Sequence, residues 1–108
     1  MQTVAALART SPWPPVTPAT PDAELAERAA HGDDEAFVAI MRRHNRLLLR
    51  TGRSILKSDA EAEDALQEAY LRAWRSMASF RAESKLSTWL TRIVINEALG
   101  RSARRLDG

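Results

Sequence analysis

The sequence contains no cysteine among its 108 residues, so disulfide frameworks, cysteine-ligated zinc and thiol catalysis are excluded. Glycine, proline and tyrosine are also scarce, with 4, 5 and 1 copies. This scarcity argues against an all-β fold, because such folds need many turns and many β-forming side chains. No stretch approaches the roughly eighteen continuous apolar residues of a membrane span, and the N-terminus lacks the basic start and full apolar stretch of a secretory signal. We therefore expect a cytoplasmic protein without membrane insertion.

Residues suited to catalysis or metal binding are equally sparse. The two histidines, His31 and His44, stand thirteen positions apart without partners at metal-ligand spacing. His44 falls on an apolar stripe, which favours packing over catalysis. The acidic run at 33–35 is better explained by helix capping than by a metal site, and the glycines are too scattered for a phosphate-binding loop. We expect neither an enzyme nor a bound metal or cofactor.

Charge is distributed unevenly along the chain. Residues 1–40 carry two arginines against six acidic residues, a net charge of −4, whereas residues 41–108 carry fourteen basic residues against eight acidic ones, a net charge of +6. Such a charge asymmetry suits a protein that presents one face to a polyanion and another to a different partner. Ordinary solvated helix faces are the alternative explanation.

The apolar pattern predicts an all-α fold, a compact bundle of about four helices behind a flexible N-terminal leader. Four prolines and the absence of periodicity assign residues 1–19 to a disordered or extended leader. Residues 20–108 then form one helical domain, and an apolar content of 44% is ordinary for a globular chain.

Capping patterns place the helix boundaries. Thr20 is expected to cap the first helix, with Pro21 at its first position, and Gly32 suits a left-handed helix end. Asp33 is expected to cap the second helix. Ser58, followed by Glu61, opens a third, and a fourth runs from about residue 85 to residue 105. The expected core positions are Leu25, Ala26, Ala29, Phe37, Ile40, Met41, His44, Leu47, Leu48, Thr51, Ile55, Ala62, Leu66, Ala69, Tyr70, Ala73, Met77, Leu86, Leu90, Ile93 and Leu99.

A basic stripe runs along the second helix. Its five cations recur at spacings of four, four, three and four, with no acidic residue between positions 41 and 57, so they share one helical face. Like charges at this spacing repel by roughly 0.2–0.5 kcal/mol per pair, which a polyanionic partner would offset through counterion release. Neutralisation by acids of the first helix is the alternative. The possible phosphate stripe consists of Arg42, Arg46, Arg50, Arg53 and Lys57.

Four segments carry a family resemblance. They are residues 25–37 (LAERAAHGDDEAF), 59–74 (DAEAEDALQEAYLRAW), 80–90 (FRAESKLSTWL) and 92–99 (RIVINEAL). In this order they resemble the second conserved region of bacterial RNA polymerase sigma factors, in particular the extracytoplasmic-function (ECF) group, over about residues 22–106. The resemblance implies a non-catalytic protein that binds core RNA polymerase and directs it to promoters. The implied partners are the clamp helices of the β′ subunit, the single-stranded minus-ten promoter element and an anti-sigma factor.

The third helix corresponds to the family's polymerase-docking helix. On the face opposite its expected core side, one leucine stands within a polar rim, an arrangement that suits a small protein interface. A singly exposed leucine without a role is the alternative. The candidate polymerase-binding residues are Asp64, Gln67, Glu68, Leu71 and Arg75.

Residues 80–89 correspond to the segment that holds unstacked minus-ten bases. An aromatic ring, two cations and short hydroxyls near a helix start suit contacts to phosphates and bases. Trp89 matches an aromatic position used in melting by larger relatives, but their second aromatic is Leu90 here, and core packing is the alternative. On the last helix Asn96 matches a position that the family uses near DNA, while Gly100 replaces an acid found in many relatives. The candidate DNA-binding residues are Phe80, Arg81, Lys85, Ser87, Thr88, Trp89, Arg92, Asn96, Arg101 and Arg104.

The resemblance also leaves one domain without a counterpart. ECF factors carry a second helix-turn-helix domain that reads the minus-35 element, and the sequence stops before it. We expect an isolated domain, either a piece of a longer protein or a natural single-domain protein. The alternative function is a helical adaptor or anti-sigma target that docks on polymerase without binding DNA, and a generic nucleic-acid-binding bundle is the third.

Overall fold

The computed structural model describes residues 12–107, with side chains described as far as residue 105. Four α-helices follow one another: α2 (Asp22–Ala30), α3 (Asp34–Leu56), α4 (Asp59–Ser76) and α5 (Leu86–Asp107). A short 3-10 helix, η1 (Met77–Ser79), follows α4. Residues 12–107 contain no strand. The all-α fold predicted from the sequence is confirmed, and so is the order of its four helices.

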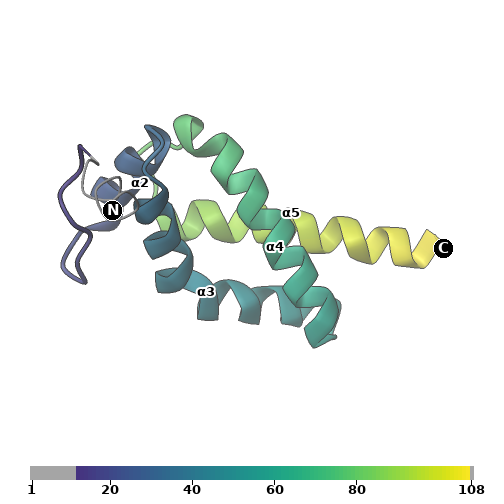
Figure 1. Ribbon diagram of the computed structural model, residues 1–108. Helices are drawn as coiled ribbons and strands as arrows, with labels where there is room; N and C mark the ends of the chain where they lie inside the picture. Colours follow the sequence, from purple (N-terminus) through teal and green to yellow (C-terminus); the bar gives the residue numbers. More distant parts are fainter. Residues whose placement is uncertain (1–11, 108) are drawn as a thin grey trace, which may run out of the picture.

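Helix α3 occupies the centre of the arrangement, because it packs against α2, α4 and α5. Helix α4 crosses in front of α5 in Figure 1, and the last part of α5 projects beyond the other helices to the C-terminus. Helix α2 lies at the opposite end of the molecule, beside the N-terminal segment.

One main core joins all four helices. Leu25 of α2, Ile40 and Leu48 of α3, and Leu90 and Val94 of α5 are almost completely buried in it. A smaller cluster of Leu56, Ala65 and Ala98 joins α3, α4 and α5. Burial of a large aliphatic side chain contributes about 1.5–3 kcal/mol, so these contacts hold the helices in place.

Two expected core positions are wrong. Leu47 and Leu99 are 42% and 53% exposed. On α5 the buried side is a row spaced by four residues, from Leu86 through Leu90 and Val94 to Ala98. Leu99 stands one position further along, and one position turns a side chain by about 100° around the helix. Leu47 is displaced in the same way from Leu48, which is buried.

The predicted caps of the second and third helices are confirmed. The Asp33 carboxylate accepts hydrogen bonds from the backbone N–H groups of Glu35 and Ala36, and the Ser58 hydroxyl accepts one from Glu61. Gly32 adopts φ +97° just after α2, which is the left-handed conformation that glycine tolerates best.

Thr20 does not cap α2, in contrast to the prediction. The N-cap is Pro21, which makes no side-chain cap hydrogen bond. The Thr20 hydroxyl instead accepts a hydrogen bond from the backbone N–H of Thr17 at 3.0 Å, and the Thr20 N–H donates to the Thr17 carbonyl at 3.0 Å. The threonine therefore closes a turn before the helix.

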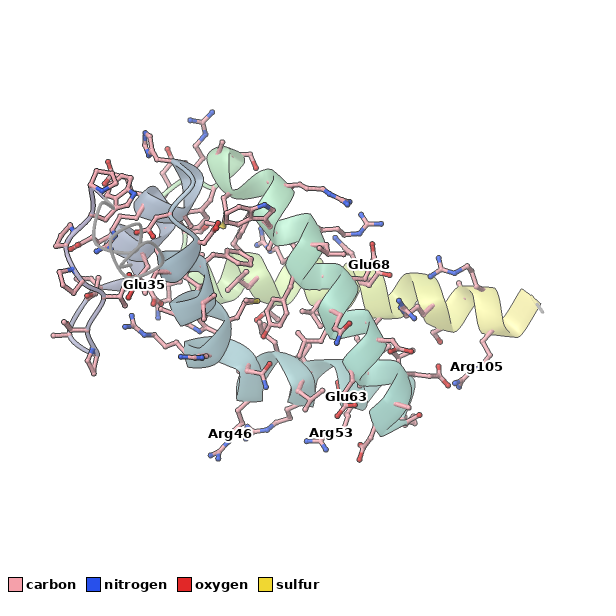
Figure 2. The ribbon with its side chains drawn as sticks, in the orientation of Figure 1. Glu35, Arg46, Arg53, Glu63, Glu68 and Arg105 are labelled. Carbon is pink, nitrogen blue, oxygen red and sulfur yellow. The ribbon has the colours of Figure 1, made fainter. Side chains whose placement is uncertain are left out.

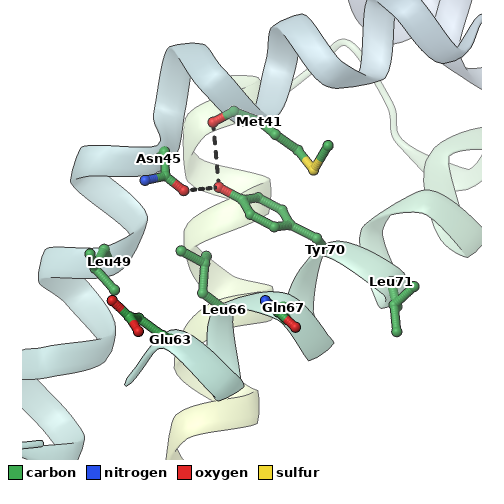
Figure 3. A pocket seen from close by; sticks show the side chains of 8 residues that line it. All are labelled: Met41, Asn45, Leu49, Glu63, Leu66, Gln67, Tyr70 and Leu71. Atoms are coloured by element: carbon green, nitrogen blue, oxygen red, sulfur yellow. Dashed lines mark hydrogen bonds between the residues drawn. The ribbon is translucent and has the colours of Figure 1, made fainter. Parts of the chain in front are cut away.

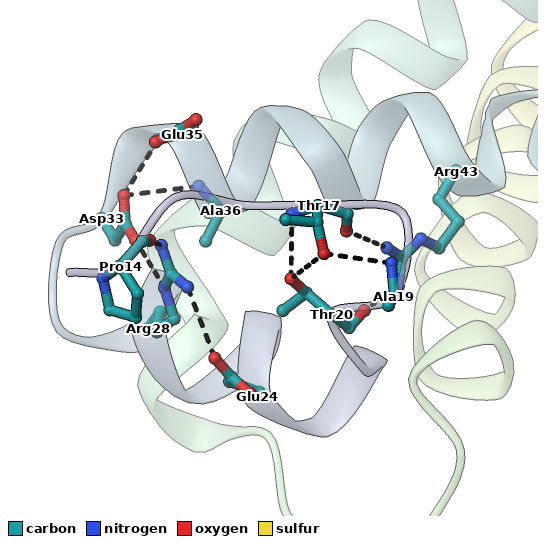
Figure 4. A network of polar contacts seen from close by, with 10 residues as sticks. All are labelled: Pro14, Thr17, Ala19, Thr20, Glu24, Arg28, Asp33, Glu35, Ala36 and Arg43. Atoms are coloured by element: carbon teal, nitrogen blue, oxygen red, sulfur yellow. Dashed lines mark hydrogen bonds and ion pairs between the residues drawn. The ribbon is translucent and has the colours of Figure 1, made fainter.

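Residues 12–19 of the expected leader form no helix and pack against the bundle, whereas residues 1–11 lie outside the described residues. Two arginines hold the segment by its backbone (Figure 4): Arg28 of α2 donates to the Pro14 carbonyl, and Arg43 of α3 donates to the Thr17 carbonyl at 3.5 Å. Arg43 also donates to the carbonyl of the adjoining Thr20 at 2.7 Å. Val16 packs against the main core.

A buried ion pair joins α2 to α3. Nε of Arg28 lies 2.8 Å from Oδ2 of Asp33, and the two side chains are 3% and 5% exposed. Glu24 adds a second, more exposed partner at 3.4 Å. The same Asp33 also caps α3, so one carboxylate joins the last turn of α2 to the start of α3.

Candidate functional site

The outer face of α4 carries the residues that the sequence assigned to a protein interface. Leu71 is 48% exposed, and Asp64, Gln67 and Arg75 are exposed around it, with Glu68 half-buried. The opposite side of α4 is buried through Ala65, Leu66, Ala69 and Ala73, among others. All five predicted residues are thus at least partly accessible, on the side of α4 that faces away from the core.

A groove between α3 and α4 extends this face. Its volume is about 540 Å³. Figure 3 shows its lining, which comes from one side of each helix. The lining residues are Met41, Asn45 and Leu49 of α3 and Glu63, Leu66, Gln67, Tyr70 and Leu71 of α4. Gln67 and Leu71 were predicted from the sequence as interface residues, whereas the α3 wall was not.

The missed α3 wall carried a weak sequence signal. Met41, Asn45 and Leu49 recur every four residues, which places them on one face of the helix, but Met41 alone was assigned, and to the core. It packs against the edge of the core while also lining the groove. Only the packing of α4 beside α3 turns this row into one wall of a groove.

Tyr70 fixes the floor of the groove. Its hydroxyl donates a hydrogen bond to Oδ1 of Asn45 at 2.9 Å, with the Met41 carbonyl oxygen at 3.4 Å (Figure 3). Burial raises the pKa of Tyr70 to about 12, because a phenolate would lose hydration there. The side chain therefore stays a neutral donor that ties α4 to α3.

A second hollow, of about 370 Å³, lies beside the segment before α5. Its lining includes the predicted residues Phe80, Lys85 and Ser87, together with Asp22 and Ala23 from the start of α2. The segment begins as Phe80 leaves η1 in an extended conformation, and it turns where the Ser84 N–H donates to the Arg81 carbonyl at 3.3 Å. The contribution of α2 to this hollow was not anticipated from the sequence.

The two aromatic rings of this segment pack together. The rings of Phe80 and Trp89 have centroids 5.3 Å apart and planes at 58°. Both side chains are half-buried and contact the main core. Trp89 therefore packs against the core, the alternative left open by the sequence. Arg81, Lys85 and Thr88 are exposed, and Ser87 is half-buried.

Helix α5 continues from this segment with a mixture of accessible and engaged side chains. Arg92, Asn96 and Arg104 are exposed. Arg101 instead lies half-buried with its Nε 3.3 Å from Oε2 of Glu97, and it donates to the Asp64 carbonyl of α4 at 3.4 Å. Arg101 was predicted to contact DNA, but in this arrangement it links α5 to α4.

Glu97 is the centre of that link. Its side chain is 7% exposed, and Oε1 lies 3.0 Å from Nε of Arg72 on α4. A buried carboxylate needs such partners, because its desolvation is otherwise costly. Glu97 thereby joins α5 to Arg72 of α4, while Arg101 of its own helix shares the carboxylate.

The ion pairs divide the cations into two groups. Within residues 12–105, those with an acidic partner are Arg28, Arg43, Arg53, Arg72, Arg101 and Arg105. Those with none are Arg42, Arg46, Arg50, Lys57, Arg75, Arg81, Lys85, Arg92 and Arg104. The second group falls on the outer face of α3, the outer face of α4, the segment before α5, and α5 itself. Unneutralised charge thus gathers on surfaces that the sequence assigned to partners.

Two other properties bear on the class of site. In the described part of the chain, no helix combines the length and apolar character needed to cross a membrane. The same residues contain no cluster of three or more acidic or histidine side chains arranged to hold a metal ion.

Comparison with known proteins identifies relatives of this chain. The family model described as Sigma-70 region 2 matches residues 40–106. The chain is 45% identical over 83 residues to the ECF RNA polymerase sigma factor SigM of Mycobacterium tuberculosis, which covers 77% of this chain and 42% of that relative. It is 36% identical over 78 residues to the ECF RNA polymerase sigma-E factor of Escherichia coli strain K12, covering 71% and 40%. The chain therefore spans less than half the length of these curated relatives.

A solved structure is similar over its full length. It is the NMR structure of an engineered region 2 of sigmaE in complex with GTAAAA. The TM-score is 0.73 at 32% identity, and the match covers 86% of this chain and 100% of that one.

Proposed function

The chain belongs to the Sigma-70 region 2 family, and on that premise we propose that it is the sigma-factor domain that docks on core RNA polymerase and recognises and melts the minus-ten promoter element. The observation that carries the proposal is the separation of two accessible surfaces on one rigid bundle. One is the groove between α3 and α4. The other is the hollow beside residues 80–87. A protein that connects an enzyme to its template needs two such surfaces. The domain itself contributes no catalytic group, and its place of action is the cytoplasm, where the polymerase works.

The groove between α3 and α4 is the proposed docking surface for the clamp helices of the β′ subunit. Leu71 supplies a half-exposed apolar anchor, and the groove beside it offers room for a side chain of the partner. Gln67 and Glu68 surround this anchor with hydrogen-bonding groups. Apolar anchors within a polar rim are the usual arrangement of small, specific protein interfaces.

The hollow beside residues 80–87 is the proposed site for unstacked minus-ten bases. It lies between the start of α2 and the segment before α5, and the similar region 2 domain of sigmaE is in complex with GTAAAA, which supports a nucleic-acid ligand. Arg81 and Lys85 are exposed and without acidic partners in the described residues. Such cations attract the phosphates of a strand whose bases enter the hollow.

Melting then follows from differential binding. Extruding a base from the duplex costs a few kcal/mol in lost stacking and pairing. A site that fits only the extruded base shifts the equilibrium toward the open strand, because the duplex gains nothing from it. Helix α5 continues from the site with Arg92 and Asn96 exposed, which suits contacts to the adjacent DNA.

The proposal is tested by two binding measurements on the chain. A pull-down with a β′ clamp-helix fragment tests docking, and fluorescence anisotropy with single-stranded and duplex minus-ten oligonucleotides tests capture. We expect retention of the clamp fragment and tighter binding of the single strand. Docking without any single-strand preference would favour the helical adaptor or anti-sigma target instead. An anti-sigma factor is a further partner under the same proposal, and such a factor would compete with the clamp fragment for the groove.

A further inference from the structure

The outer face of α3 is a charged surface that the proposed function does not use. It carries the α3 basic stripe, defined as Arg42, Arg46, Arg50, Arg53 and Lys57, and all five side chains are exposed. At about 100° per residue, the four arginines fall within an arc of roughly 80° around the helix, and Lys57 follows them as the C-cap residue of α3. Figure 2 shows Arg46 extending from α3 away from the rest of the bundle.

Neutralisation by α2, the alternative considered from the sequence, does not reach this stripe. The acid of α2 that approaches α3 is Asp22, and its carboxylate lies 3.0 Å from Nη1 of Arg43 and 3.0 Å from Nε2 of His44. Both of these residues stand outside the stripe. Within it, Arg53 alone has an acidic partner in the described residues, Asp59 at 3.3 Å, and both members of that pair are largely exposed.

The chain therefore leaves a row of like charges at a spacing that weakens the helix. Arg28, Arg43, Arg72 and Arg101, which hold helices together, all have acidic partners. Arg42, Arg46, Arg50 and Lys57 make no ion pair with any described residue. Their charges thus stabilise the fold through no ion pair. Such an exposed row of cations is instead suited to binding a ligand outside the chain.

We infer that the α3 basic stripe binds the phosphate backbone of duplex DNA, at a site separate from the hollow beside residues 80–87. From Arg42 to Lys57 the stripe is roughly 22 Å long at 1.5 Å per residue, a length that runs beside about six phosphates of one DNA strand. The regular row of cations matches the regular row of phosphates in charge and in extent.

Two features favour duplex DNA over a single strand and over a protein partner. Phe37, the one phenylalanine, tyrosine or tryptophan of α3, is buried, so α3 exposes no such ring on which an unpaired base could stack, whereas single-strand sites depend on such rings. The apolar side chains that α3 exposes, Val38 and Leu47, lie nine positions apart on opposite sides of the helix, so they form no central anchor of the kind on which protein interfaces depend. Phosphate contacts need neither, and they position a duplex without reading its sequence.

The site adds a second kind of DNA contact to the proposed function and does not depend on base capture. The hollow selects unstacked bases, while the stripe binds any duplex with equal affinity. Such a contact holds DNA near the domain before melting, and it depends steeply on salt, because each phosphate neutralised releases a counterion.

The test is a salt titration of duplex binding by the whole chain. The probe is a fluorescent duplex without a minus-ten sequence, and the variant is the triple substitution Arg42→Gln, Arg46→Gln, Arg50→Gln, which removes charge while keeping side chains of helical preference. We expect roughly tenfold weaker binding per arginine near 0.1 M salt, and a slope of log affinity against log salt that is shallower by about 0.9 per lost contact. Replacing the same three arginines by lysine retains the charge and should retain most of the slope. Arg105→Gln, at an exposed cation of α5 whose charge is already paired with Glu61, is the matched control and should leave the slope unchanged.

Two outcomes overturn the inference. One is a triple glutamine variant whose duplex affinity and slope equal those of the wild type. The other is an unchanged slope together with lost binding to core polymerase, which would assign the stripe to a protein interface. Single-strand preference, measured on the same variants, separates this inference from the proposed function: the stripe variants should keep that preference, and its absence in the wild type would refute base capture without affecting the duplex slope.

Discussion

The hydroxyl of Tyr70 donates to the amide oxygen of Asn45 across 2.9 Å, and this bond joins α4 to α3 at the floor of the docking groove. The sequence alone assigned no role to the acceptor, Asn45. The bond requires a protonated phenol, since a phenolate has no hydrogen to donate. The geometry of the groove is therefore linked to the ionisation of one side chain.

Alkaline titration should reveal this link. The pKa of Tyr70 is raised to about 12 in the folded chain, whereas an unfolded chain titrates near 10. Between these values the unfolded state has lost the proton that the folded state keeps, so the free energy of unfolding should fall as pH rises from about 10 towards 12. Below pH 10 the phenol is protonated in both states and its contribution is complete.

Because Tyr70 is the sole tyrosine of the chain, phenolate absorbance reports this group alone. Urea unfolding at several alkaline pH values, compared with Tyr70→Phe, measures its share of the pH dependence. The phenylalanine variant should be less stable at pH 7, by about 0.5–1.5 kcal/mol for the lost hydrogen bond. A phenolate midpoint near pH 10 in the folded chain would contradict the burial argument.

Truncation of Leu71 should weaken polymerase docking without unfolding the domain. The side chain is 48% exposed, so Leu71→Ala should change stability by no more than about 0.5 kcal/mol. Affinity for the β′ clamp fragment should fall by at least about 1 kcal/mol if Leu71 is an anchor, and Gln67→Ala should weaken binding in the same assay. Leu47→Ala is the matched control, since Leu47 is 42% exposed on α3 and lies outside the groove lining. Equal losses for Leu71→Ala and Leu47→Ala would remove the docking assignment.

Removal of the Phe80 ring should reduce single-strand binding. If the ring stacks on a base, Phe80→Ala should weaken binding of single-stranded minus-ten DNA by roughly 1–3 kcal/mol. The ring also packs on Trp89 and on the core, so the alanine variant is expected to be less stable. Phe80→Leu keeps an apolar side chain in place and removes only the flat ring, which makes it the decisive variant.

The control for this prediction is Trp74→Leu, which removes an exposed aromatic ring from α4, away from the hollow. It should leave DNA binding as in the wild type. Sequence discrimination measured by anisotropy with promoter and scrambled oligonucleotides checks the outcome. A folded Phe80→Leu variant that discriminates as well as the wild type would show that the ring has no part in base capture.

Two glycine substitutions should change stability in opposite directions. A Cβ atom added at Gly52 within α3 would lie 3.5 Å from Cβ of Ala62, an ordinary contact. Gly52→Ala should therefore stabilise the domain by about 0.8–1.0 kcal/mol through helix propensity. At Gly32 the backbone has φ +97°, so Gly32→Ala should destabilise it, by more than about 0.4–1 kcal/mol. Thermal unfolding of the two variants measures the sign of each change in stability. A destabilised Gly52→Ala variant would mean that α3 and α4 pack more closely than this distance indicates.

Much of this protein was determined by local sequence alone. Asp33 and Ser58 cap helices because a short side-chain acceptor just before an apolar repeat can reach the first free N–H groups, whatever the rest of the chain does. Gly32 ends α2 because φ +97° is open to glycine. The exposed face of α4 and the cationic stripe of α3 also follow from the period of a single helix.

Only the tertiary structure decided how these helices meet. Leu47 and Leu99 satisfy an apolar pattern and yet remain exposed, because the crossing of α3 and α5 determines which row of each helix is covered. One wall of the groove consists of Met41, Asn45 and Leu49, and it exists because α4 packs beside α3. The hollow before α5 is lined in part by Asp22, which is distant in sequence. The sequence assigned Arg101 to DNA binding, whereas in the structure it contacts Glu97 and the Asp64 carbonyl. Helix period is a local property with a fixed repeat, whereas the partner of each face depends on contacts between residues far apart in sequence, for which one sequence carries no local signal.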